Sequence, residues 1–204
     1  LTKKKAPWHQ PGTTATISAV TLFSPGVYDV TLSGGDLASL NGTVTLSFAS
    51  GQNIVDAAGN ALATPVTTSS YVVDNTTSTV TTVALSDVQI TDADDGATVT
   101  ATITFSEAMD QMVAPTVTNN AGTTLTSGSG AWTSATTYVM TYTVDDANVD
   151  LADVTFDVTG AKDLAGNTQV AATAVSTGSD VDTVNATVTT VALSDVQITD
   201  ADDG

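Results

Sequence analysis

An internal repeat constrains this chain more than any other feature. The 18 residues TVTTVALSDVQITDADDG at 79–96 return without a change at 187–204, 108 positions later. A shorter motif, Asp-x-Ala-Gly-Asn, begins at Asp56 and again at Asp163, 107 positions apart. An identity of this length indicates a recent duplication inside a tandem array, in which each repeat forms one structural unit.

The repeat divides the chain into four parts. Residues 1–12 match nothing in the rest and are expected to be a leader- or tail-like segment. Residues 13–75, here called the first repeat, correspond to the back part of a unit. Residues 76–182, the complete repeat, make one whole unit, and residues 183–204, the tail, begin a third with its first strand. This frame is typical of a window on a longer array.

Composition and residue patterning predict strands throughout. Hydrophobic residues make up 41% and charged residues 13%, which argues against disorder. Thr and Val abound, and both favour strands. In the complete repeat we expect seven strands near 80–90, 97–105, 113–118, 123–127, 136–144, 153–159 and 169–177. Around seven short strands in about 100 residues are typical of an Ig-like sandwich.

Alternation is clearest in three of these strands. Val99, Ala101, Ile103 and Phe105 share one face, opposite a row of threonines. The residues expected to point inward in the two later strands are Tyr138, Met140, Tyr142, Val144, Val154, Phe156 and Val158. In the first repeat, 26–33, 43–49 and 71–73 match the last strands of the complete repeat. We therefore predict an all-β chain of tandem Ig-like β-sandwich domains.

Several motifs resemble the bacterial Ig-like repeats of large cell-surface and biofilm adhesins. The stretch ATITFSEAMD at 101–110, followed by strands and by KDLAGNT at 162–168, carries the resemblance, as does GVYDVTLSGGDLASLNGTVTLSF with DAAGNAL in the first repeat. The resemblance implies an extracellular, cell-surface extender. Its domains form a stalk, often stiffened by Ca²⁺ at domain junctions, that holds a distant adhesive module away from the cell.

Charge excludes several other classes of function. Four Lys+Arg stand against 22 Asp+Glu, for a net charge of −18, so the basic face that nucleic acids require is missing. No apolar run reaches the roughly 20 residues that cross a bilayer, so we expect no membrane insertion of this segment. The chain has no Cys and a single His, His9, and its acids lie on loops without an aromatic cleft. We expect no enzyme.

Antiparallel topology predicts that the acids gather at two poles of the complete repeat. One pole receives Glu107, Asp110 and Asp163 from two loops, facing Asp74 and Asn75 of the incoming linker. The other pole receives the acids Asp92, Asp94, Asp95, Asp145, Asp146, Asp150 and Asp182. Crowded carboxylates repel, and Ca²⁺ takes six to eight oxygen ligands in flexible geometry. These twelve residues are the candidate ligands.

Other interpretations stay open at this point. Asp and Asn are good turn residues that also keep a surface soluble, and this explains the clusters without a metal. The partners expected for such repeats are neighbouring repeats of the same chain. A self-assembling extracellular filament or surface-layer subunit, joined head to tail through the tail strand, is one alternative function. A carbohydrate- or ligand-binding module is another.

Overall fold

The computed structural model describes residues 8–49, 54–56, 58–63 and 69–192. Within them the chain is all-β: it forms several sheets, consistent with a β-sandwich, and only two short 3-10 turns. No helix in this described part is long and apolar enough to cross a membrane. The expected leader up to residue 7 lies outside the described residues, whereas Trp8–His9 form a short strand.

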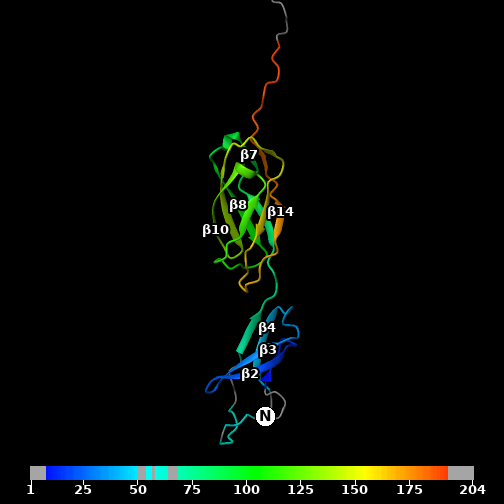
Figure 1. The fold of residues 1–204 in the computed structure, drawn as a ribbon, viewed down its shortest axis with the longest axis vertical. Helices are drawn as coiled ribbons and strands as arrows, with labels where there is room; N and C mark the ends of the chain where they lie inside the picture. Colours follow the sequence, from blue (N-terminus) through cyan, green and yellow to red (C-terminus); the bar gives the residue numbers. More distant parts are fainter. Residues whose placement is uncertain (1–7, 50–53, 57, 64–68, 193–204) are drawn as a thin grey trace, which may run out of the picture. The chain divides into compact units, whose positions relative to one another are not determined.

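Four strands of the first repeat and one short strand just before it form two sheets, drawn blue to cyan in Figure 1. The strands are β1 (Trp8–His9), β2 (Thr16–Ser24), β3 (Val27–Ser33), β4 (Gly42–Phe48) and β5 (Ser69–Val73). One sheet has the order β1-β4-β5, and β2 pairs with β3 in a hairpin. The predicted strands 26–33, 43–49 and 71–73 are thus confirmed as β3, β4 and the end of β5.

The complete repeat contains ten strands and two 3-10 turns. Its N-terminal elements are β6 (Val80–Leu85), β7 (Gln89–Thr91), η1 (Asp92–Asp94), β8 (Thr98–Phe105), β9 (Thr116–Asn119) and η2 (Gly122–Thr124). Its C-terminal elements are β10 (Leu125–Trp132), β11 (Thr137–Val144), β12 (Asp150–Leu151), β13 (Thr155–Thr159), β14 (Ala172–Ser176) and β15 (Asp180–Asp182).

These strands form three sheets around one core. A four-stranded sheet has the order β10-β11-β8-β6, and two three-stranded sheets have the orders β14-β13-β9 and β12-β15-β7. The predicted alternation in β8 is confirmed, because Val99, Ala101, Ile103 and Phe105 are all buried. Tyr142 of β11 and Phe156 of β13 meet with ring centroids 5.7 Å apart, which joins the two faces.

Two expected strands differ from the structure. The strand expected at 80–90 splits into β6, which pairs with β8, and β7, which pairs in parallel with β15. The chain changes sheets at Ser86–Val88, where the Asp87 side chain accepts a hydrogen bond from the Gln89 amide at 3.1 Å. The strand expected at 123–127 instead begins at Leu125 and runs on to Trp132, because its pairing with β11 continues to Trp132 opposite Tyr138. A side chain at Gly130 would collide with the hydroxyl of Tyr138.

Contacts between Cα atoms divide the chain into two compact units that do not follow the repeats. The first unit comprises Leu1–Ser78, Glu107–Val113 and Ala161–Val170, and the second comprises Thr79–Ser106, Ala114–Gly160 and Ala171–Gly204. Two loops of the complete repeat therefore associate with the linker that leaves β5.

Candidate metal centre

Three carboxylates meet where the linker and these two loops come together. Side-chain oxygens of Asp74, Glu107 and Asp163 all lie within 4.8 Å of one another. Asp74 follows β5, Glu107 follows β8, and Asp163 begins the Asp-x-Ala-Gly-Asn motif. Oxygens that share one Ca²⁺ at 2.3–2.6 Å are separated by at most about 5 Å, so the spacing fits a single cation. We call these three residues the acidic triad.

Asp163 is held in place before any ion binds. Its side chain is 2% exposed, and its Oδ1 accepts hydrogen bonds from the backbone amides of Ala165 and Asn167, each at 2.9 Å. The Asn167 side-chain amide donates to Oδ2 at 2.9 Å. Gly166, at φ 93°, takes the left-handed conformation that closes the turn. The acid therefore serves as a turn residue and presents a fixed carboxylate.

The loop that carries Glu107 lies alongside this turn. Met109 pairs with Asp163 in an antiparallel bridge, and the Asp110 amide donates to the Lys162 carbonyl at 2.8 Å. Met109 itself is 1% exposed, so its packing anchors the loop. The backbone pairing brings Glu107 to Asp163 although 56 positions separate them in the sequence.

Asn167 connects the turn to the linker. Its side-chain amide donates to the backbone carbonyls of Asp74 at 3.1 Å and of Thr76 at 3.0 Å. The Asp74 side chain in turn accepts the Thr76 amide at 2.9 Å, which leaves its second carboxylate oxygen for another partner. The Val170 amide donates to the Ser78 carbonyl at 2.9 Å and holds the end of the linker.

The negative charge of the acidic triad is not balanced by positive charge. Partial burial raises the pKa of Glu107 above its usual range, and the charges of Asp163 and Asp74 raise it further. No group in this part of the structure lowers the pKa of Glu107. The repulsion between carboxylates at this distance is relieved when a cation binds, when one carboxylate is protonated, or when one acid is replaced by a neutral residue. The site can therefore hold a metal ion with oxygen ligands.

Two other candidates near the triad have local roles. Asn75 turns toward the first repeat, where its side-chain amide donates to the carbonyls of Leu37 at 3.0 Å and Leu40 at 2.7 Å. Asp110 accepts the Met112 amide at 2.9 Å, which closes a turn within the loop. Neither residue belongs to the cluster of three.

The structure brings the acids of the other predicted pole only partly together. Asp95 accepts the Asp146 amide at 3.0 Å, which joins the two acidic loops, and Asp150 lies opposite Asp182 across β12 and β15. The remaining acids are occupied locally: Asp94 accepts from Thr91, and Asp145 accepts from Thr126. Asp92 starts η1. Within the described ranges, no three of these acids gather as the acidic triad does.

Asn167 is not among the twelve candidate ligands, although the sequence places it at the same pole as Asp163 and it holds both the Asp163 carboxylate and the linker. The repeated motif predicts Asn167 as a turn residue that bonds the backbone. In the first repeat Asp56 accepts the amides of Ala58 and Asn60 at 2.9 Å and the Asn60 side chain at 2.8 Å, in the same arrangement. The motif thus forms the same turn in both repeats. The hydrogen bonds from Asn167 to the linker are additional to that turn.

Comparison with known proteins does not assign the chain to a family. No family model, no curated protein and no solved structure matches the chain.

Proposed function

We propose that the chain is a stretch of extender repeats from a bacterial surface adhesin, built of tandem Ig-like β-sandwich domains. In this proposal the protein lies outside the cell and carries no catalytic activity. Its repeats hold a distal adhesive module away from the cell surface. The resemblance of the motifs at 101–110 and 162–168 to such repeats supports this function.

The acidic triad is the observation that carries the mechanical part of the proposal. A cation bound there would join a linker residue, Asp74, to two loops of the following domain through Glu107 and Asp163. We assign the ion as Ca²⁺, because three carboxylates with nearby carbonyls suit its flexible, oxygen-rich coordination. Mg²⁺ keeps more water and demands a stricter octahedron.

The chain repeats the linker part of this arrangement. Asp182 lies 108 positions after Asp74, and its side chain likewise caps the residue two positions on, accepting the Val184 amide at 3.2 Å. A following repeat with the same motifs would supply the counterparts of Glu107 and Asp163. One clamp would then recur at each junction, so that an array stays extended under load.

Thermal unfolding in chelator and in Ca²⁺ tests this function. Extracellular Ca²⁺ modules bind with Kd values near 0.1–1 mM, and free Ca²⁺ about tenfold above Kd stabilises a site by about 1.4 kcal/mol. We expect millimolar Ca²⁺ to raise the melting temperature by several degrees and Mg²⁺ to raise it less.

Two isosteric variants locate the effect. Asp74→Asn keeps an oxygen for the Thr76 amide but removes the charge, and it should abolish the response to Ca²⁺. Asp182→Asn makes the same change at the equivalent position away from the acidic triad and should leave the response intact. An equal response in both variants would place the ion elsewhere and refute the clamp.

A further inference from the structure

The loop that joins β3 to β4, residues 34–41, anchors the linker on the side of the first repeat. The backbone N–H of Asn75 donates to Oδ1 of Asn41 at 2.6 Å. The Asn75 side-chain amide donates to the carbonyls of Leu37 at 3.0 Å and Leu40 at 2.7 Å. Loop and linker belong to the same compact unit. Asn41 therefore holds the backbone of the linker directly.

Asn41 is also the one asparagine of the chain that is followed by glycine. The side-chain amide carbon of an asparagine can be attacked by the backbone nitrogen of the next residue, which closes a five-membered ring. A side chain on that next residue hinders the attack, and glycine has none. Within the described part of the chain, no atom beyond its two neighbours comes within 4 Å of where a Gly42 Cβ would stand. Both residues are exposed, so water reaches them.

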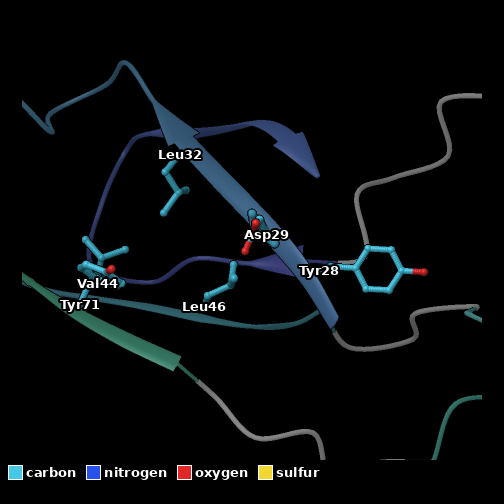
Figure 2. A pocket seen from close by; sticks show the side chains of 7 residues that line it. Tyr28, Asp29, Leu32, Val44, Leu46 and Tyr71 are labelled. Atoms are coloured by element: carbon cyan, nitrogen blue, oxygen red, sulfur yellow. The ribbon is translucent and has the colours of Figure 1, made fainter. Parts of the chain in front are cut away.

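Gly42 lies where the β4-β5 pairing ends. It is the first residue of β4, and it pairs with Val73, the last residue of β5. Figure 2 shows Val44 and Leu46 of β4 beside the hollow between β3, β4 and β5, and Val44 is buried. The inward packing of β4 thus begins two residues after Gly42. Because the end of a strand frays without unfolding the sheet, the Gly42 nitrogen becomes available for reaction.

The hydrogen bond from the linker activates the same side chain. The Asn75 N–H donates to Oδ1 of Asn41 and draws electrons away from Cγ, the atom that a nucleophile attacks. When a nitrogen adds to Cγ, negative charge develops on Oδ1, and a donor already aimed at that oxygen stabilises it. The contact that anchors the linker therefore also assists ring closure at Asn41.

We propose that Asn41 is a site of spontaneous deamidation, and that its conversion to isoaspartate releases the linker from the first repeat. The backbone nitrogen of Gly42 loses its proton to water and forms a bond to Cγ of Asn41. The bond between Cγ and Nδ2 breaks, and Nδ2 takes up a proton and leaves as ammonia. Water then opens the cyclic imide at one of its two carbonyls and gives aspartate or isoaspartate. Water is the only co-reactant, and nothing is oxidised or reduced.

The two products differ in what they do to the anchor. Aspartate keeps the length of the main chain and an oxygen in the place of Oδ1, so the Asn75 N–H keeps its acceptor. Isoaspartate directs the main chain through Cγ, which lengthens it by one carbon and makes Oδ1 a main-chain carbonyl oxygen. That oxygen cannot stay opposite Asn75 while Gly42 remains paired with Val73. Only isoaspartate should therefore release the linker, with or without a bound cation.

Peptide mapping by mass spectrometry tests whether the modification occurs. The folded full chain is incubated in chelator at mildly alkaline pH, and peptides that contain aspartate are separated from those that contain isoaspartate. We expect Asn41 to convert severalfold faster than Asn60, which is also exposed in the first repeat but is followed by Ala61. An Asn41 that converts no faster than Asn60 in the folded chain overturns the proposal.

Amide hydrogen exchange in chelator tests the release of the linker. In chains with isoaspartate at position 41, the Asn75 amide should exchange severalfold faster than in the fresh chain. The Asn60 amide, which donates to Asp56 at 2.9 Å, should keep its rate. The variant Asn41→Asp adds the charge without the extra carbon and should leave the Asn75 amide slow. Unchanged exchange at Asn75 after isoaspartate has formed, or equal acceleration in Asn41→Asp, would overturn the proposed release.

Discussion

The two repeats of this chain show how much of a sandwich core depends on its first strands. In the complete repeat, Phe156 and Tyr142 are 0% and 1% exposed, because β8 and the strands beside it close the core. In the first repeat, strands β3, β4 and β5 bury Val44, but Leu22 is 62% exposed and Tyr71 is 75% exposed. Similar strand sequences thus reach different burial.

The two Asp-x-Ala-Gly-Asn turns, by contrast, have the same local geometry in both repeats. Their hydrogen bonds agree within 0.1 Å, although Asp163 is buried and Asp56 is exposed. A turn specified by local bonds forms regardless of its surroundings. The core depends on distant strands, whereas the turn depends on five consecutive residues, so the repeats should differ in stability far more than in local geometry.

Truncation of the core should produce the largest difference between the repeats. Phe156→Ala removes a fully buried ring and should cost about 3–5 kcal/mol of unfolding free energy. Leu46→Ala at the corresponding position removes a half-buried side chain and should cost about 1 kcal/mol. Amide hydrogen exchange measures the stability of each repeat separately. Equal costs would mean that the first repeat has a closed core.

Substitution of the turn aspartates should produce a smaller difference. Asp163→Asn places an amide group against the Asn167 side chain in a buried position and should cost about 1–3 kcal/mol. Asp56→Asn makes the same change where water can replace the lost bond, so it should cost less than Asp163→Asn does. Urea unfolding of the two variants checks the order, and a reversed order would contradict the assigned burial.

The effect of neutralising Glu107 on stability should change sign between chelator and Ca²⁺. In chelator, Glu107→Gln removes like-charge repulsion and should stabilise the chain by less than about 1 kcal/mol, since solvent screens the triad. In Ca²⁺ the variant should be less stable than the wild type, because it has lost a ligand. Asp110→Asn serves as the control, and it should show neither change.

The pH dependence should distinguish the triad from the exposed turn. The raised pKa of Glu107 means that the folded chain binds more protons than the unfolded chain, so stability in chelator should rise as the pH falls toward about 4.3. Hydrogen bonds from Asn60 lower the pKa of Asp56, so its contribution is present above about 3.9 and is lost below. Melting temperatures from pH 7 to pH 2 record both trends.

Much of the fold could be predicted because its signals are local. The period-2 alternation of apolar residues predicted the buried face of β8. The split of 80–90 into β6 and β7 could not be predicted, because it depends on which sheet each half joins. The run of β10 through Ser127–Gly130 was also missed, since Gly and Ser read as a turn until Tyr138 packs against Gly130.

The sequence predicted the pole of the complete repeat at which each candidate ligand lies. Topology placed Asp74, Glu107 and Asp163 at one pole, and the structure brings their oxygens together. Topology could not separate these three from Asn75 and Asp110. In the structure the Asn75 side chain binds a carbonyl of the first repeat, and Asp110 accepts a backbone amide of its own loop. Side-chain hydrogen bonds decide which of these residues join the acidic triad, and the sequence does not specify those bonds.

Calcium titration of the Glu107 carboxyl shows whether the acidic triad binds the ion. Glu107 is the only glutamate of the chain, so glutamate labelled at the side-chain carboxyl carbon gives a single resonance. We expect this resonance to shift and saturate with a Kd of about 0.1–1 mM Ca²⁺ in the wild type and to stay unshifted in Asp74→Asn. A resonance that keeps its chelator position through 10-fold higher Ca²⁺, about 10 mM, would contradict the clamp.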